Sequence, residues 1–457
     1  MSKKKQILFA HQNFPAQYKH LAPALSNRKD IEVSSLAITQ RKIPNINNYF
    51  YNLSTGNNDG THRLALEFEA KMIRAESAAK RCLELREDGL EPDIVISHPG
   101  WGETLFIKEV WPNTKLLNYF EYYYHTNNSD VDFDNDPELN HERGFELYTK
   151  LIARNQPLLM SCLQSDAMIS PTKFQADTAP NAFRNNIHVI HDGVDTDFLK
   201  PDKEAYITLS KESGLANEVT KLTKKDKIVT FVNRNLEPYR GYHIFMRALP
   251  EILEKHPDAY ILIVGEFGVS YGATPKDGTS YKDKFLNEVR KDLKENIKRL
   301  RFLGRVDYNS LISMFRVSSA HVYLTYPFVL SWSMIEAMSV GSLVIGSDTE
   351  PVKEVISNNK NGLLVDFHDP KNLAKKVIEV LDNKDDYDVI RSEARKTVIK
   401  NYDLNTVCLP KQIELVESLF WLNLKKYLKM FIESFQKNIL MKEVILVRTI
   451  IKINFLK

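Results

Sequence analysis

The chain alternates short, continuously apolar runs with longer segments in which apolar residues recur at helical spacing. In the first half the runs occupy residues 6–10, 93–97, 115–120 and 166–170. The rhythm then restarts with runs at 227–233, 259–265, 299–304, 320–325 and 342–347. Strands that are apolar on both faces and separated by helices are typical of a parallel sheet covered on both sides. The pattern therefore predicts an α/β protein with two doubly wound halves.

The segment between the two halves predicts where one domain ends and the next begins. It opens as a strand in IHVIHDGV (187–194), turns at Asp192-Gly193 and then becomes charged and weakly patterned. A chain of 457 residues also exceeds the size at which a single hydrophobic core keeps growing. We predict a first domain over 1–195, a second domain over 196–405, and a closing helix with a basic tail over 406–457.

Charge is concentrated in that tail. Residues 421–457 carry eight Lys or Arg and two acids, although the whole chain has a net charge of only +3. The tail mixes lysines with large aliphatic and aromatic residues. This composition suits either an amphipathic helix on an anionic membrane surface or a helix packed against the protein. The small net charge gives no argument for a nucleic-acid partner.

Three widely spaced cysteines, Cys82, Cys162 and Cys408, fit neither a disulfide framework nor a zinc-site spacing, which favours a reducing compartment. The opening stretch has too few apolar residues for a signal peptide, and no run reaches the roughly 18 residues of a spanning helix. We expect a cytoplasmic protein, with peripheral contact at the inner face of the membrane through 421–457 as the open alternative.

Two arginines surround the turn after the first strand of the second half. Arg234 directly follows the run 227–233, and Arg240 with Gly241 opens the next helix. In doubly wound sheets, ligands bind outside the carboxyl ends of the strands. Two guanidinium groups and a helix N-terminus at such an edge suit a phosphate group, because the planar guanidinium binds it bidentately. The alternative is a pair of solvated surface arginines, and the position after a strand favours the anion site.

A single carboxylate, Glu336, stands within the otherwise apolar or small stretch 326–347. Ser331 and Ser333 are plausible N-caps of the short helix that contains it. At the carboxyl end of a strand, Glu336 could accept hydrogen bonds from sugar hydroxyls, as carboxylates facing a ribose do. It could equally be a salt-bridged surface residue, and the residue alone leaves both readings open.

Weaker signals follow other strands. His98 comes after the run 93–97, although a lone histidine is more often structural, and Gly265 ends a strand of the second half. The aromatic stretch EYYYHT (121–126) either lines a cleft or fills core. Acids at 130, 132, 134 and 136 hint at calcium, but the glycine and glutamate that the calcium-loop template requires are absent, so we interpret the stretch as an acidic loop.

Taken together, these residues resemble the family-4 retaining glycosyltransferases, whose GT-B fold has two facing Rossmann-like domains with a cleft between them. The likeness covers about residues 5–405. It rests on the two arginines followed by VGEFG, FLGRV, EAMSVGSLVIGSD and NGLLVDFHDP, in that order. The stretch IHVIHDGVDTDFLKP is similar to the family's interdomain segment, with Asp192 in place of an asparagine.

The resemblance implies a role for each matching residue. Arg234 and Arg240 would hold the diphosphate of a nucleotide-sugar donor, Glu336 its ribose, and His98 would lie at the donor sugar. The remaining donor contacts would come from Gly265, Arg305, Val306, Leu330, Ser331 and Trp332. The turn 11–17 would face the acceptor with Asn13, Phe14 and Gln17. Neither a metal nor another cofactor is expected, because the arginines take the metal's place.

One position departs from the family pattern. The first acid of the family's E-x(7)-E motif should stand eight residues before Glu336, where this chain has Phe328. The resemblance implies transfer of a sugar, with retention of configuration, from a nucleoside-diphosphate sugar to a hydroxyl of a glycan or glycolipid. The alternatives are a catalytically silent subunit that binds the sugar nucleotide, which Phe328 suggests, and a nucleotide-sugar 2-epimerase.

Overall fold

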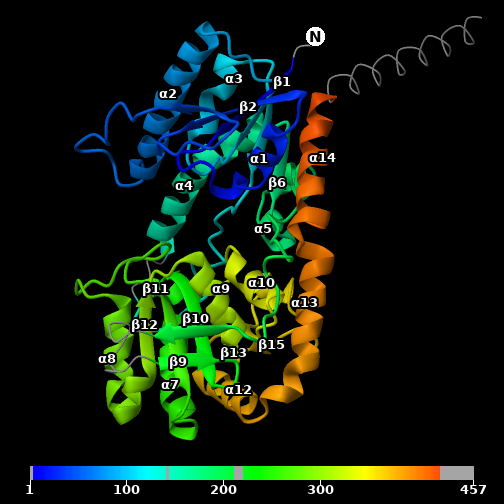
Figure 1. The fold of residues 1–457 in the computed structure, drawn as a ribbon. Coiled ribbons are helices and arrows are strands. Elements are labelled where there is room, and N and C mark those ends of the chain that lie inside the picture. The colour runs from blue at the N-terminus through cyan, green and yellow to red at the C-terminus, as the bar shows by residue number, and fades with distance from the viewer. Residues whose placement is uncertain (1–3, 140–143, 210–219, 422–457) are drawn as a thin grey trace, which may run out of the picture.

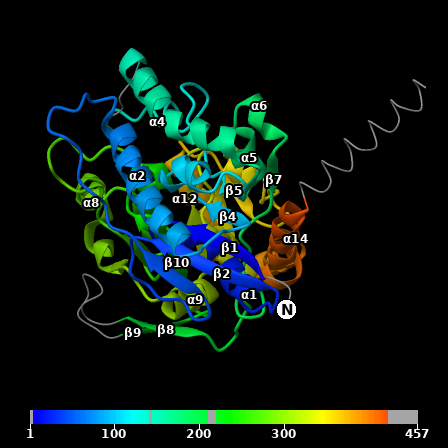
Figure 2. The same cartoon turned by 90° about the horizontal axis from the view of Figure 1, so that it is seen from above.

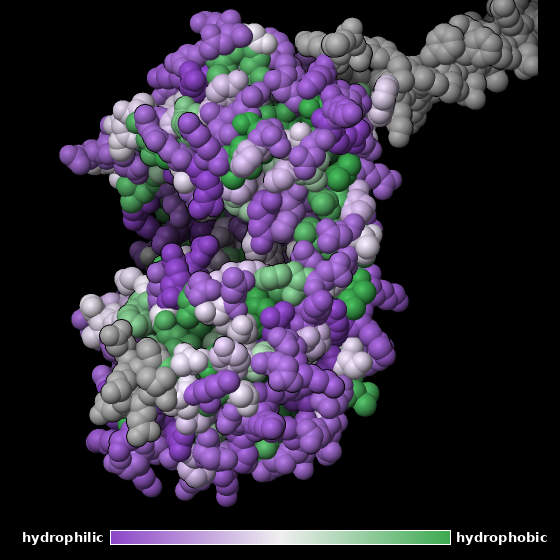
Figure 3. All heavy atoms as spheres, in the orientation of Figure 1, coloured by the Kyte–Doolittle hydropathy of each residue, from purple (hydrophilic) through white to green (hydrophobic). Residues whose placement is uncertain are grey.

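The computed structural model describes residues 4–139, 144–209 and 220–421, which form two α/β domains stacked one above the other (Figure 1). Each domain is built on a parallel sheet with helices on both faces, so the predicted pair of doubly wound, Rossmann-like domains is confirmed. The space-filling view shows a hollow between the two halves on one side of the molecule (Figure 3).

The sheet of the first domain has seven parallel strands in the order β3-β2-β1-β4-β5-β6-β7. The strands are β1 (Lys5–Ala10), β2 (Ile31–Ala37), β3 (Asn47–Phe50), β4 (Ile94–Ser97), β5 (Lys115–Tyr119), β6 (Ala167–Ser170) and β7 (Ile187–Val189). The helices are α1 (Leu21–Ser26), α2 (Leu66–Glu87), α3 (Ile107–Val110), α4 (Gly144–Gln164), α5 (Lys173–Asp177) and α6 (Asn181–Arg184), with 3-10 turns η1 (Ala16–Tyr18) and η2 (Glu103–Phe106). Seen from above, α2 and the closing helix α14 (Leu409–Phe420) lie on opposite sides of β1 and β4 (Figure 2).

The sheet of the second domain has six parallel strands in the order β12-β11-β10-β13-β14-β15. The strands are β10 (Ile228–Asn235), β11 (Tyr260–Glu266), β12 (Leu300–Gly304), β13 (Ala320–Tyr323), β14 (Val344–Ser347) and β15 (Leu363–Val365). The helices are α7 (Tyr242–Lys255), α8 (Tyr281–Leu293), α9 (Tyr308–Val317), α10 (Trp332–Ser339), α11 (Glu350–Lys353), α12 (Pro370–Asp382) and α13 (Asp388–Tyr402), with 3-10 turns η4 (Pro238–Arg240), η5 (Lys294–Arg299) and η6 (Lys384–Tyr387). An antiparallel hairpin of β8 (Tyr206–Leu209) and β9 (Thr220–Thr223) precedes this sheet.

The chain crosses between the domains twice at one place. Val194, on the way out, forms a parallel bridge with Asp403, on the way back. Gly193 has a φ of +86°, and a side chain there would meet Leu404. After the π-helical turn η7 (Leu404–Cys408), α14 places Leu415, Val416 and Leu419 in the core of the first domain. The second domain is therefore inserted into the first.

A second connection is not covalent. Residues 120–139, which we call the bridging segment, leave β5 of the first domain and pack on the second domain. Phe133 contacts the rings of Tyr326 and Phe367. Asp134 accepts a hydrogen bond from the Tyr326 hydroxyl at 2.7 Å, and Asp136 forms an ion pair with Arg247. Of the four acids that hinted at calcium, those at 130, 134 and 136 therefore dock the two domains, whereas the acid at 132 accepts amides of its own turn.

The predicted membrane contact of the basic tail lies outside the described residues, apart from Trp421. Among the residues that the structure describes, no helix is both long enough and apolar enough to cross a membrane.

Candidate active site in the cleft between the domains

The two candidate arginines differ in how they are held. Arg234 stands near the end of β10, one residue before the strand terminates, with its side chain exposed. No described residue forms a hydrogen bond or ion pair with its guanidinium group. Arg240 ends η4 and is only 6% exposed. A free, exposed cation thus lies close in sequence to a fixed, buried one.

Arg240 is fixed by neutral groups. It donates hydrogen bonds to the Thr325 hydroxyl at 2.7 Å and to the Val329 carbonyl at 2.9 Å, and it lies 5.2 Å from the ring centroid of Tyr271. Burial acts to lower the pKa of Arg240, but Tyr323, Tyr271 and Glu237 outweigh it, and the pKa rises. The guanidinium therefore stays charged without a carboxylate bonded to it.

Gly241 makes this position possible. Its φ is +68°, and a Cβ there would lie only 2.3 Å from the Cβ of Leu324. A residue with a side chain would push α7 away from the loop after β13, because both the backbone conformation and the space exclude it. The turn therefore sets the N-terminus of α7 directly after Arg240 and against the loop that follows β13.

Glu336 has a partner, but the partner is not a cation. It lies in α10, is 6% exposed, and its Oε1 accepts a hydrogen bond from the Tyr308 hydroxyl at 2.8 Å. Burial raises the pKa of Glu336, while Tyr308 and Lys19 act in the opposite direction. Ser331 caps this helix by accepting from the Ser333 amide.

The start of α10 is tied to the first domain. The Trp332 indole donates to Asp192 Oδ2 at 2.8 Å, and the Tyr119 hydroxyl donates to the same oxygen at 3.0 Å. Burial raises the pKa of Asp192 to about 6. Of the other residues expected in this loop, Leu330 is buried, and the Ser331 amide already donates to the Tyr323 hydroxyl at 2.8 Å.

The residues expected beside the donor lie at the carboxyl ends of β11 and β12. A Cβ at Gly265 would lie 2.8 Å from the Leu236 side chain, so the backbones approach closely there. Arg305 is exposed and forms an ion pair with Glu266 at 3.0 Å. Val306 is half-buried and packs against the core of the second domain.

On the opposite side of the cleft, two histidines lie next to each other. His98 follows β4, is buried, and contacts the ring of His11 at a centroid distance of 5.8 Å. Its Nδ1 accepts the Gly100 amide at 3.1 Å, which leaves the ring proton of the neutral form on Nε2. His11 Nδ1 accepts the Asn13 amide at 3.0 Å. Burial, with His98 nearby, lowers the pKa of His11 to about 3.

The turn expected to face the acceptor divides into two kinds of residue. Asn13 is exposed and accepts a hydrogen bond from the Thr39 hydroxyl, and Gln17 is half-buried. Phe14 is 1% exposed and packs on Phe9, so its side chain belongs to the core of the first domain. A direct acceptor contact from this turn would therefore come from Asn13 or Gln17.

The structure adds residues that the sequence did not assign to the site. Phe328 is 3% exposed, and rings from both domains surround it: Tyr122, Tyr124, Tyr239 and Tyr271. Glu121, directly before this aromatic contact, lies 3.5 Å from His98 through its Oε2. The only sequence signal for them was that EYYYHT follows a strand.

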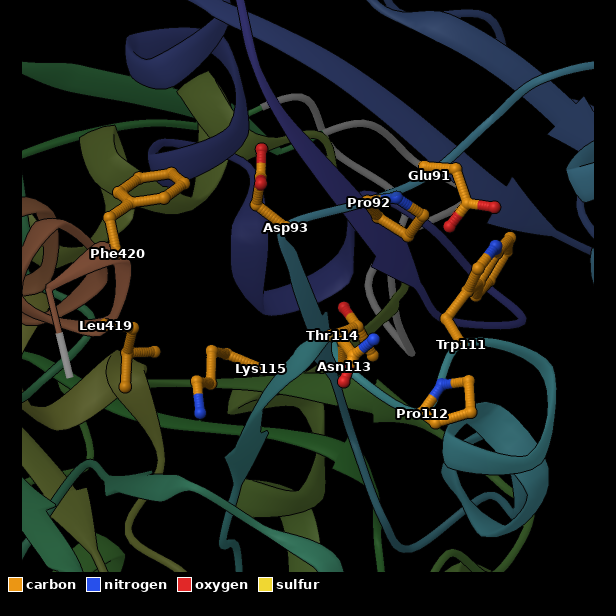
Figure 4. Close-up of a pocket in the computed structure, with 10 residues that line it drawn as sticks. All are labelled: Glu91, Pro92, Asp93, Trp111, Pro112, Asn113, Thr114, Lys115, Leu419 and Phe420. Atoms are coloured by element: carbon orange, nitrogen blue, oxygen red, sulfur yellow. The ribbon is translucent and has the colours of Figure 1, made fainter. Parts of the chain in front are cut away.

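A pocket of 290 Å³ lies elsewhere, at the amino ends of β4 and β5 (Figure 4). Asp93, Trp111 and Lys115 line it together with Phe420 of α14. Since ligands of doubly wound sheets bind at the carboxyl ends of the strands, this pocket is not part of the candidate site. Within the described ranges, no group of three or more His, Cys, Asp or Glu side chains is placed to hold a metal ion. Metal independence remains a prediction.

Comparison with known proteins gives matches over both domains. The model of the glycosyl transferase family 4 group matches residues 29–199, and the model of the glycosyl transferases group 1 matches residues 215–397. Spore coat protein SA of Bacillus subtilis is 26% identical over 53% of this chain and 62% of its own length. A phosphatidyl-myo-inositol mannosyltransferase of Mycolicibacterium smegmatis is 30% identical over 35% of this chain and 37% of its own length. The matched part thus spans less than two thirds of these relatives.

Solved structures share the whole fold. Sucrose-phosphate synthase from Thermosynechococcus elongatus has a TM-score of 0.67 at 15% identity, covering 91% of this chain and 99% of that one. Anabaena HepE, solved in complex with UDP, has a TM-score of 0.59 at 13% identity, with coverages of 91% and 99%. Because the two family models together span most of the chain and the fold agrees, this chain belongs to the group 1 glycosyltransferases with the GT-B fold.

Proposed function

We propose that this protein transfers a sugar from a nucleoside-diphosphate sugar to a hydroxyl group of a glycan or glycolipid, with retention of configuration. The observation that carries the proposal is the pair of arginines at the carboxyl edge of the second sheet. Arg234 has no partner among the described residues, and Arg240 is charged but bonded only to neutral groups. Two cations that are bonded to no carboxylate, beside a helix N-terminus, form a site for a diphosphate.

The position of the arginines also suits the departure of the diphosphate from the sugar. As the bond between sugar and diphosphate breaks, negative charge develops on the leaving oxygens. Arg234, Arg240 and the N-terminus of α7 would lie where this charge grows, and such fixed donors stabilise a transition state. Loss of one donor of this kind typically lowers the rate by about 10²–10³-fold. The leaving phosphate would take the proton of the acceptor hydroxyl in a front-side attack.

The acceptor would enter from the first domain. His98 carries its free N–H, and Asn13 is exposed on the turn 11–17. The names of two relatives, a phosphatidyl-myo-inositol mannosyltransferase and a D-inositol 3-phosphate glycosyltransferase of Corynebacterium jeikeium, favour a hydroxyl-rich acceptor of small or lipid-linked type. We expect the protein to work without a metal.

Thermal stability in the presence of UDP, GDP, ADP and their sugar conjugates tests the proposal. A ligand at about 100 times its Kd adds about 2.7 kcal/mol to the stability, enough for a clear rise in Tm. We expect one nucleotide to stabilise the wild type and Arg234→Ala to abolish that rise. Arg290→Ala, which removes an exposed arginine of α8, should keep it. If no nucleotide raises Tm, the proposed function is wrong.

Phe328 favours one second candidate, a catalytically silent subunit that binds the sugar nucleotide. Such a subunit would show the same Tm shift. Release of free nucleotide from the bound conjugate, with an added acceptor or by slow hydrolysis, separates the two. A 2-epimerase would instead change the sugar while it is still attached to the nucleotide, which analysis of the recovered conjugate detects.

A further inference from the structure

The position of the missing motif acid is closed to any donor sugar. Phe328 is 3% exposed, and its ring lies 4.8 Å from that of Tyr122 and 5.0 Å from that of Tyr271. A phenyl ring accepts no hydrogen bond of the kind a carboxylate offers to sugar hydroxyls. The hydroxyls of a donor sugar bound at this edge therefore need another hydrogen-bond acceptor. That side chain must come from elsewhere in the molecule and reach the neighbourhood of the arginines.

A carboxylate of the first domain is held close to this position. Glu121 follows β5 and directly precedes Tyr122, whose hydroxyl lies 3.1 Å from the Pro327 carbonyl oxygen. The backbone of Glu121 is fixed as well, since its carbonyl accepts a hydrogen bond from the Gln175 side chain at 2.8 Å. Glu121 is therefore the neighbour in sequence of Tyr122, which itself contacts the loop where the motif acid would stand.

The Glu121 side chain is accessible and faces the site. It is 41% exposed, and its Oε2 lies 3.5 Å from His98 Nε2, the nitrogen that carries the ring proton. Burial raises the pKa of Glu121, but His98, Arg234 and Arg240 together outweigh it and hold the pKa below its ordinary value. The two arginines therefore act on this carboxylate from across the cleft, and it is ionised at neutral pH.

The other acids near the arginines are already engaged. Glu336 is bonded to Tyr308, and Asp192 accepts hydrogen bonds from Trp332 and Tyr119. Glu237 is buried; its Oε2 accepts the amides of Ser270 and Tyr271, and its Oε1 is closed off from solvent without a partner in the described part of the chain. Glu121 differs from these three, because its side chain is partly exposed and no described group is bonded to its carboxylate at normal hydrogen-bond length.

We propose that Glu121 supplies, from the first domain, the carboxylate that accepts hydrogen bonds from the hydroxyls of the donor sugar, in place of the motif acid for which this chain has Phe328. This inference rests on the proposed function. It assigns sugar selection to a residue of the opposite domain, while Arg234, Arg240 and Glu336 hold the nucleotide part of the donor.

The test measures the contribution of the sugar to donor binding separately from that of the nucleotide. Isothermal titration would measure the Kd of UDP and UDP-glucose, or of whichever nucleotide and conjugate stabilise the wild type, for the wild type, Glu121→Gln and Glu138→Gln. Glu138 belongs to the same bridging segment, but its carboxylate pairs with Lys284 away from the cleft. Urea unfolding of each variant shows whether the fold is kept.

Glu121→Gln should leave the Kd of the free nucleotide within about threefold of wild type and weaken the conjugate by about tenfold or more, a loss of about 1.4 kcal/mol. Glu138→Gln should change neither. If Glu121→Gln keeps the wild-type ratio of the two Kd values, Glu121 only supports His98 and the inference fails. That failure is distinct from failure of the proposed function, in which the wild type binds no nucleotide at all. If Glu121→Gln does not fold, Glu121→Asp, which withdraws the carboxylate by one methylene, must show the same selective loss.

Discussion

The two sides of the cleft differ in how their buried polar groups are paired. On the side of the second domain, Arg240 and Glu336 are each bonded to hydroxyl or carbonyl partners, and Oε1 of Glu237 is buried without a partner in the described part of the chain. On the side of the first domain, Nε2 of His11, Nε2 of His98 and Oε1 of Gln17 are buried without a hydrogen-bond partner in the described part of the chain. A buried polar atom without a partner costs about 1–3 kcal/mol. The hydrogen bonds of Arg240 and Glu336 therefore contribute stability, and the two histidines and Gln17 of the first-domain side have hydrogen-bonding capacity left for a ligand.

The largest expected effect lies on the second-domain side. Phe328→Ala should lower the free energy of unfolding by about 3–5 kcal/mol, because it opens a cavity among four tyrosines. It also removes the ring contact that Tyr122 and Tyr124 of the first domain make with the second. Urea unfolding measures the loss, and Phe145→Ala, which truncates an exposed ring, should stay within about 0.5 kcal/mol of wild type. A loss below about 1 kcal/mol at Phe328 would contradict the packing described.

The two arginines of the site should differ in how much each contributes to the free energy of unfolding. Arg240→Ala should cost about 2–4 kcal/mol, since it leaves the Thr325 hydroxyl and the Val329 carbonyl unpaired. Arg234→Ala should change stability by less than about 0.5 kcal/mol, because no described residue is bonded to this side chain. The same unfolding curves measure both variants. Equal losses would mean that Arg234 also supports the fold, and the contrast between a structural and a purely ligand-binding arginine would be wrong.

The smallest effect is expected from the first-domain side and depends on pH. The pKa of His11 is about 3 in the folded protein and about 6.5 in the unfolded chain, so the unfolded chain binds the proton first. Stability from this residue is complete above about pH 6.5 and is lost as the pH falls towards 3. Between pH 7 and 5, the wild type should therefore lose about 1–2 kcal/mol more than His11→Gln. Parallel losses in the two proteins would show that His11 is not buried as a neutral ring.

Much of this arrangement could be predicted from the sequence, and the rest depends on long-range contacts. Strands that are buried on both faces appear in the sequence as continuous apolar runs, so the sequence predicts β1, β4 and β10. Edge strands such as β3, with the sequence NNYF, carry no such signal. The arginines stand beside a strand and match a motif. Glu121, by contrast, acquires its place only because Tyr122 packs on Phe328, about two hundred positions further along the chain.

The insertion of the second domain determines the order in which the chain can fold during synthesis. The core of the first domain needs Leu415, Val416 and Leu419, which are made after the entire second domain. A nascent chain that ends near residue 195 would leave the α14 face of its sheet open to water. We therefore expect the second domain to become protected from proteolysis first, although its residues are translated later than most of the first domain. Production of the first domain alone would require α14 to be fused back onto it.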